Sequence, residues 1–156
     1  MSDAASARST ALTLLSRHHS AFNAGDHTGM LSLPTDGIAH DTNLGKCELG
    51  HAAFAGFLKR MHRSYSEQLV DIVLFADETG TRAAAGFTVL GTYQSTDERL
   101  PPATGQTYKL PAGAFFPCAM ASSQGPRCIT ILPIGCGRRG LAPLCRHREP
   151  EDFCEE

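Results

Sequence analysis

The spacing of apolar residues changes from a helical period to a strand period near the middle of this chain of 156 residues. Phe54, Phe57, Leu58 and Met61 fall at i, i+3, i+4 and i+7, which is one face of a helix. From about Glu67 onward apolar and polar residues alternate, as they do in half-buried strands. Helices followed by long strands predict an α+β fold, in which helices lie on one face of a curved antiparallel sheet.

Local signals predict the individual elements. Leu12, Leu15, His19 and Phe22 form one helical stripe, and the glycine of Asn23-Ala24-Gly25 suits the left-handed end of that helix. Asp26 can then cap a second helix. The other predicted elements are helices over 28–33 and 51–63, a short strand over 37–43 that pairs back with 46–49, and strands over 67–76, 82–94 and 106–116.

Charge and composition exclude several classes of partner. The formal net charge is −2 and the pI is about 6.4, so the chain has no basic excess for nucleic acid. It has no apolar run long enough to span a membrane, and its first ten residues lack the apolar core of an export signal. We therefore expect a cytoplasmic protein that binds neither nucleic acid nor membrane.

Three features of the first half resemble a known family. They are the run Ser20-Ala21-Phe22-Asn23-Ala24-Gly25-Asp26, the strand that ends in His40-Asp41, and Gly50 at the start of the third helix. Together they resemble the nuclear transport factor 2-like superfamily, and within it the ketosteroid isomerase-related, polyketide cyclase-like (SnoaL-like) small bacterial proteins. The segments 101–106 and 110–113 match small bacterial members of unassigned function. The resemblance covers about residues 10–116.

The resemblance implies a fold and a place for a ligand. The expected fold is a cone-shaped barrel in which a curved antiparallel sheet wraps around helices. The open mouth of such a cone suits a hydrophobic small molecule. Members of this group commonly pair through the outer face of the sheet, so a homodimer is also implied.

The resemblance also implies a chemistry. It places Asp41 on the general base that moves a proton next to a carbonyl group, and His18 on a tyrosine that stabilises the oxyanion. In ketosteroid isomerase an Asp base acts with a Tyr and a protonated Asp. The position of that second Asp falls on Gly113, which offers only its backbone. The expectation is proton transfer or related acid–base chemistry on a hydrophobic carbonyl compound. The alternatives are a non-catalytic binding module of the same fold and an inactive copy.

Further residues are candidates for contacts with that ligand, although each can equally be a core residue. His18 and His19 are adjacent and point about 100° apart on a helix, so they cannot both face one metal ion. We therefore expect neither a metal nor a cofactor. The expected polar contacts are Asn43, Tyr93 and Tyr108, and the expected apolar walls are Phe57, Met61, Phe87 and Phe115.

The character of the chain changes after Phe116. The last 40 residues hold five of the six cysteines, have no C-x-x-C pair and show no sustained apolar period. Shifting the reading frame by one nucleotide from Pro117 allows the string LRDGKLARATVYYNLADWLRQ, which supplies the D-G-K turn and Tyr-rich strand that normally end this fold. We therefore expect a domain over 1–116 and an off-register, poorly ordered tail over 117–156.

Two consequences of an off-register tail follow. Only 128–134 has the β-branched character to occupy the vacant sheet edge, and the homodimer would be weakened. The alternative is a genuine cysteine-rich extension.

Overall fold

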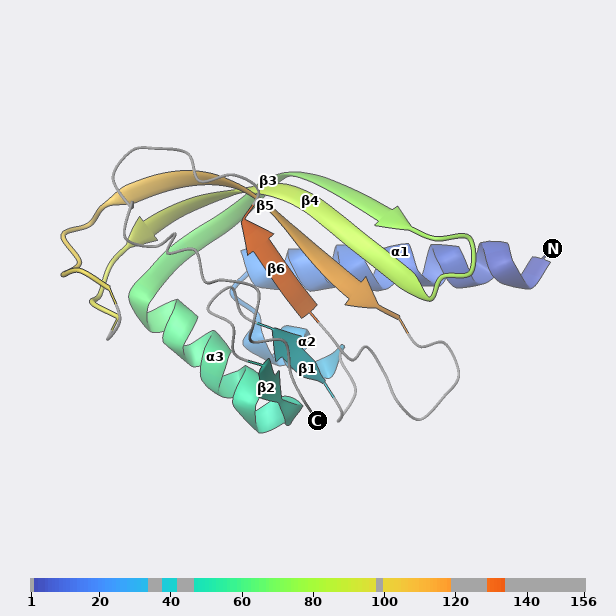
Figure 1. Ribbon diagram of the computed structural model, residues 1–156, viewed down its shortest axis with the longest axis horizontal. Helices are drawn as coiled ribbons and strands as arrows, with labels where there is room; N and C mark the ends of the chain where they lie inside the picture. Colours follow the sequence, from blue (N-terminus) through green and yellow to red (C-terminus); the bar gives the residue numbers. More distant parts are fainter. Residues whose placement is uncertain (1, 34–37, 42–46, 98–99, 119–128, 134–156) are drawn as a thin grey trace, which may run out of the picture.

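The computed structural model describes residues 2–33, 38–41, 47–97, 100–118 and 129–133. Helices come first and long strands follow, as the change of period predicts (Figure 1). The elements are α1 (Ser2–Asn23), α2 (His27–Ser32), β1 (Ala39–Asp41), β2 (Cys47–Leu49), α3 (Gly50–Ser64), β3 (Tyr65–Ala76), β4 (Arg82–Tyr93), β5 (Thr107–Pro117) and β6 (Ile129–Pro133).

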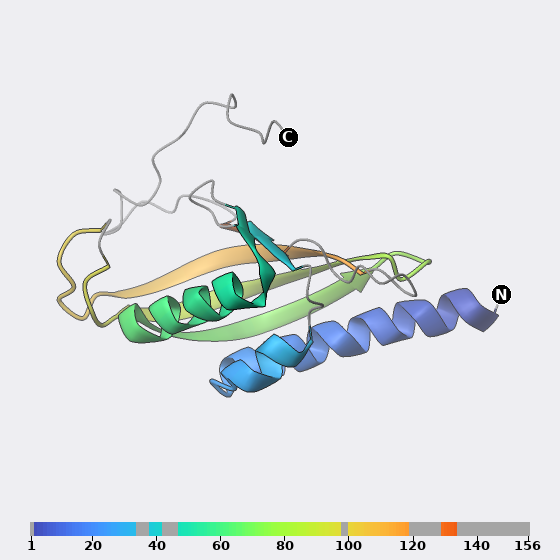
Figure 2. The same cartoon turned by 90° about the horizontal axis from the view of Figure 1, so that it is seen from below.

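The strands form one curved sheet in the order β2-β1-β6-β5-β4-β3. All neighbours in the sheet are antiparallel except β1 and β6, which are parallel. Helices α1 and α3 lie on the same face of β3, β4 and β5 (Figure 2). The expected α+β class and curved antiparallel sheet are confirmed, and the sheet wraps around the helices without closing into a barrel.

The residues from Phe22 to Asp26, where α1 ends and α2 begins, have identifiable structural roles. Phe22 packs against the core, and the Asn23 amide is bonded to the backbone of Leu69 in β3. Gly25 has φ +66, a conformation that favours glycine. The Asp26 carboxylate accepts a hydrogen bond from the Gly29 amide at 2.8 Å. The expected end of the first helix and cap of the second are therefore confirmed.

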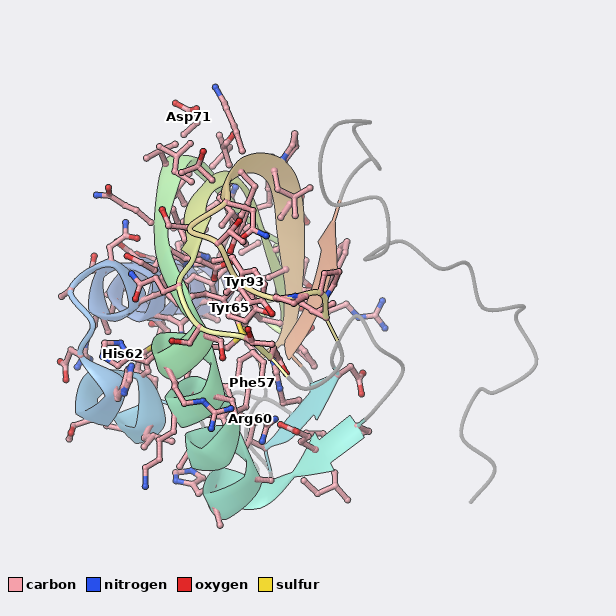
Figure 3. The ribbon with its side chains drawn as sticks, turned by 90° about the vertical axis from the view of Figure 1, so that its left-hand side faces the viewer. Phe57, Arg60, His62, Tyr65, Asp71 and Tyr93 are labelled. Atoms are coloured by element: carbon pink, nitrogen blue, oxygen red, sulfur yellow. The ribbon has the colours of Figure 1, made fainter. Side chains whose placement is uncertain are left out.

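A bulge in β3 shifts the alternation of the sheet. The pairing with β4 changes register between Val70 and Val73, and Asp71 adopts φ 54. Leu69 faces the core before the bulge and Ile72 faces it afterwards. Asp71 projects from the outer rim of the sheet (Figure 3). The bulge bends β3 so that both halves of this long strand cover the helices.

The hydrophobic core fills the space between the helices and the sheet. Buried side chains come from all three helices and from β3, β4 and β5. They include Leu15, Met30, Ile38, Phe54, Leu58, Phe87, Val89 and Phe116. No helix in the described ranges is long and apolar enough to cross a membrane.

The short strand β6 occupies the free edge of β5. It pairs with β5 from Ala112 to Phe115 and with β1 at His40 and Asp41. This agrees with the expectation that the segment around 128–134 would take the vacant edge. The rest of the expected tail, beyond Cys118, lies outside the described residues.

Candidate active site

Histidines from two elements gather on the helix-covered face of the sheet. His18 and His19 come from the last turns of α1, and His40 comes from β1. The His18 ring lies 5.6 Å from Phe116, and the His19 ring lies 5.5 Å from Phe87. In the part of the chain that the structure describes, no three side chains of His, Cys, Asp or Glu come together as a metal site. The face therefore carries imidazoles set against aromatic rings.

His19 is a satisfied core residue. Its side chain is 3% exposed, and its Nδ1 lies 2.7 Å from the carbonyl oxygen of Leu15, one helical turn earlier. The carbonyl can only accept, so Nδ1 carries the proton. This agrees with the position of His19 on the apolar stripe of α1.

His18 is neutral at neutral pH. Burial, with smaller contributions from nearby His19 and His40, lowers its pKa from 6.5 to about 4. The side chain is still partly exposed, so the site reaches the surface here. A neutral imidazole in this position can donate a hydrogen bond to an oxygen atom without adding a positive charge.

His40 is the least exposed of these three histidines. It is 1% exposed, and its ring lies 4.1 Å from that of Phe57 and 5.3 Å from that of Phe54. Its Nδ1 is 3.7 Å from Oε2 of Glu48, and neither atom has a hydrogen-bond partner. Burial lowers the pKa of His40, whereas the Glu48 carboxylate opposes this shift.

Glu48 faces His40 and is held by Arg60. It pairs with His40 across the β1–β2 ladder, so both side chains occupy the same face. Its Oε1 accepts a hydrogen bond of 2.5 Å from Nη2 of Arg60 on α3. The Arg60 guanidinium also lies 5.9 Å from the centre of the Phe57 ring, and Figure 3 shows the two neighbouring side chains on α3.

The register places Asp41 on the other face of β1. Successive residues of a strand point to opposite faces, and His40 points toward α3. The paired positions Asp41, Thr130 and Phe115 form one row across the sheet, and Phe115 is 55% exposed on the outer face. The structure therefore brings His40, and not Asp41, to the side of the sheet where His18 lies. This differs from the expected common cavity for Asp41 and His18.

The other expected ligand contacts are divided among three places. Phe57 contacts His40, Phe87 is buried beside His19, and Met61 is partly buried on α3. Phe115 faces outward, and its neighbour Phe116 is the residue that is buried on the inner face. Asn43 lies outside the described residues.

Tyr93 occupies a separate polar cluster at the other end of the sheet. It stacks on Tyr65 at 5.2 Å, and the two rings are labelled together in Figure 3. Its hydroxyl accepts from the amide of Asp97 and donates to the carbonyl of Pro101. Tyr93 therefore fixes the loop after β4, in contrast to the expected ligand contact.

A carboxyl–phenol pair lies on the helix-covered face near this loop. Tyr108 donates a hydrogen bond to Glu67 across β4, and its ring passes over Gly91. Burial raises the pKa of Glu67, although the bond from Tyr108 opposes this shift. Burial likewise raises the pKa of Tyr108.

An open groove of about 390 Å³ lies away from the histidines. It runs between the first turns of α1 and the turn after β3, where Arg8 donates a hydrogen bond to the carbonyl of Ala76. Arg8 and His18 are about 15 Å apart along the helix, at 1.5 Å per residue. The groove is lined by Ala4, Ala5, Arg8, Ser9, Leu12 and Glu78.

Glu48 and Arg60 are functional candidates that the sequence pattern does not single out. The expected pairing of 46–49 with the first strand could have identified Glu48, because the register of that pairing decides which residue faces His40. Arg60 lies three residues after Phe57, so it shares the face of α3 that meets β1.

Comparison with known proteins gives one family and many solved structures. Residues 15–119 match the SnoaL-like domain. A provisionally named polyketide cyclase from Xanthomonas campestris pv. campestris is 47% identical, with a TM-score of 0.74 over 80% of this chain and 90% of that one. A second, from Pseudomonas putida KT2440, is 44% identical, with a TM-score of 0.74 over 78% and 90%.

More distant structures share the fold alone. An NTF2-like protein from Burkholderia xenovorans LB400 is 17% identical, with a TM-score of 0.61 over 80% of this chain and 88% of that one. A search of curated proteins finds no match.

Proposed function

Because the chain belongs to the SnoaL-like domain family, we propose that it is a small-molecule enzyme that moves a proton on a hydrophobic carbonyl compound. The observation that carries this proposal is the meeting of His18 and His40 with the rings of Phe57 and Phe116 on the helix-covered face. Aromatic rings suit an apolar ligand, and imidazoles suit general acid–base catalysis near neutral pH.

The proposed step is the formation of an enolate. A base takes a proton from the carbon next to the carbonyl, the electron pair of the C–H bond forms the new C=C bond, and the oxygen takes the negative charge. Neutral His18 donates a hydrogen bond to that oxygen, and the proton is later returned to carbon. The resemblance implies Asp41 as the base, whereas the register supports its neighbour His40, which faces the helix-covered side.

The provisional names of the relatives agree with this substrate class. Polyketide cyclases act on chains of carbonyl groups, and the hydrogens between two such groups are acidic. A cyclisation of that kind starts from the same enolate. The proposal therefore takes from these relatives only the carbonyl-bearing, apolar character of the ligand.

Exchange of hydrogen for deuterium tests the proposal directly. We expect the protein to accelerate the exchange of the α-protons of 2-tetralone, a bicyclic aromatic ketone, in deuterium oxide as followed by proton NMR. His18→Phe keeps an aromatic ring beside Phe116 and removes the donor, so exchange should fall about 10²–10³-fold, the usual cost of losing an oxyanion donor. Arg17→Gln, on the exposed side of the same turn, is the control.

The same experiment separates the alternatives. Binding of 2-tetralone without any exchange above the solvent rate would contradict catalysis and identify a binding module of this fold. Neither binding nor exchange, with this ketone and with smaller and larger aromatic ketones, would contradict the proposal and favour an inactive copy.

A further inference from the structure

We infer that His40 is the acid–base residue of this site and that Glu48, held by Arg60, is the positioning residue that orients it. This inference rests on the proposed proton-transfer function and names the groups that perform it. In many active sites the histidine that acts as the base is oriented by a carboxylate that faces its other ring nitrogen. His40 and Glu48 have this arrangement, without a nucleophilic side chain.

The first support is the unsatisfied pair of polar atoms. Nδ1 of His40 and Oε2 of Glu48 are both buried, lack partners, and lie 3.7 Å apart. A short movement of either side chain closes this gap to a hydrogen bond. Bonds between catalytic groups are often this long before substrate binds.

The second support is the contrast with His19. His19 is as buried as His40, and its Nδ1 is satisfied by the carbonyl of Leu15. A purely structural histidine needs such a partner, because a buried polar atom without one costs about 1–3 kcal/mol. His40 instead faces a carboxylate, whose charge stabilises the imidazolium that forms when a base takes a proton.

The third support is the anchoring of Glu48. Arg60 donates the 2.5 Å bond to Oε1 and leaves Oε2 directed at His40. The guanidinium is itself restrained by the face of the Phe57 ring, which also packs on His40. The Phe57 ring on α3 therefore contacts both His40 and Arg60.

The charges around His40 favour one tautomer. Burial lowers the pKa of His40 overall, Glu48 and Asp41 oppose this shift, Arg60 adds to it, and His18 lies close enough to interact electrostatically. With Nδ1–H directed at the carboxylate, Nε2 holds the free electron pair. Nε2 then takes the α-proton of the ketone, and the same proton returns to carbon, which leaves His40 neutral as it began.

NMR of the imidazole nitrogens tests the inference without any substrate. In ¹⁵N-histidine-labelled protein we expect His40 to carry its proton on Nδ1. Glu48→Gln should lower the pKa of His40, because the opposing carboxylate charge is lost, and should add the Nε2–H tautomer. Arg63→Gln, exposed on the same helix, should change neither. An unchanged tautomer and pKa in Glu48→Gln would overturn the inference.

Exchange kinetics with 2-tetralone complete the test. We expect His40→Gln to lose about 10²–10⁴-fold in rate, the usual contribution of a general base. Glu48→Gln should lose about 10- to 100-fold, as partners that orient a histidine do, with partial rescue in Glu48→Asp.

Two outcomes separate the two claims. Full activity of His40→Gln together with loss in Asp41→Asn would overturn the role of His40 and leave the proposed function standing. An inactive wild-type protein would end the proposed function, while the tautomer measurement still decides whether Glu48 orients His40. If His40→Gln does not fold, the Glu48 variants supply both the NMR and the exchange measurements.

Discussion

Gly91 in β4 is needed because a tyrosine ring lies across its backbone. A Cβ at this position would approach atoms of the Tyr108 ring closely enough to force the ring aside. Tyr108 would then lose its hydrogen bond to Glu67. The absence of a side chain at one residue therefore allows a polar pair to span the two strands on either side of β4.

Gly91→Ala should lower the free energy of unfolding by about 1–3 kcal/mol, the usual cost of overpacking. Gly86→Ala in the same strand is the matched control, because a Cβ there meets nothing within 4 Å. Urea unfolding measures both variants. In a Tyr108→Ala background the cost of Gly91→Ala should disappear, and an equal cost in both backgrounds would show that the ring is not the cause.

The burial of His18 predicts how stability depends on pH. Its pKa is about 4 in the folded protein and 6.5 as a free side chain. Between these values the unfolded chain binds more protons, so the free energy of unfolding falls as the pH falls from 6.5 toward 4. The lowered pKa values of His19 and His40 act in the same direction, and the raised pKa of Glu67 acts against them.

His18→Phe should therefore reduce this pH dependence. Between about pH 7 and about pH 5 the His18 contribution is roughly 2 kcal/mol. Urea unfolding of wild type and variant at the two pH values gives the difference. Parallel curves for the two proteins would show that His18 titrates normally in the folded state.

At the scale of the elements, Asn23 ties the end of α1 to the middle of β3. Its amide donates to the carbonyl of Leu69 at 2.9 Å and accepts from the Leu69 amide at 2.8 Å. This clamp sits two residues before the Asp71 bulge, and it sets the position of α1 along the sheet. It thereby also sets the position of His18 and His19, which lie one turn earlier on the helix.

Asn23→Ala should cost about 1–3 kcal/mol in the free energy of unfolding, since two backbone groups lose their partner. The Leu69 amide should also exchange its hydrogen faster. Ser20→Ala, exposed one turn earlier, should change stability by no more than about 0.5 kcal/mol. Unchanged exchange at Leu69 would mean that water replaces the clamp without loss.

Local signals predicted the elements because each acts within a few residues. The Gly25 turn, the Asp26 cap and the apolar face of α3 all depend on neighbours in sequence. The site was harder to predict, because it depends on which residue of β1 faces inward. A shift of one position exchanges His40 and Asp41. The contact of Arg60 with Glu48 depends on that same register.

At the scale of the whole molecule, part of the outer face of the sheet is apolar and exposed. Phe75, Ala84 and Phe115 are paired in one row across β3, β4 and β5, and both phenylalanines are more than half exposed. Val73 lies in a neighbouring row on the same strand and is 54% exposed. Exposed apolar patches of this kind mark surfaces that another molecule covers.

The family match ends at residue 119, three residues after Phe116, where the composition of the chain changes. This supports the proposal that the tail from Pro117 is off-register. The strand β6 then occupies the edge of β5 over five residues only. A full-length final strand would extend the outer face, and the chain lacks that extension in the part that the structure describes.

We therefore predict weak self-association for this chain and a stable homodimer for a version restored from Pro117 in the other frame. Two copies meeting through the outer face would bury Phe75 and Phe115, and each Å² of apolar surface removed from water contributes about 25 cal/mol. Light scattering over a range of concentrations measures both proteins. Phe115→Lys should abolish the association in each by placing a charge in the contact, whereas Lys59→Gln, exposed on α3, should leave it unchanged. A tight dimer of the chain as it stands would contradict the off-register tail, and a dimer insensitive to Phe115→Lys would place the contact elsewhere.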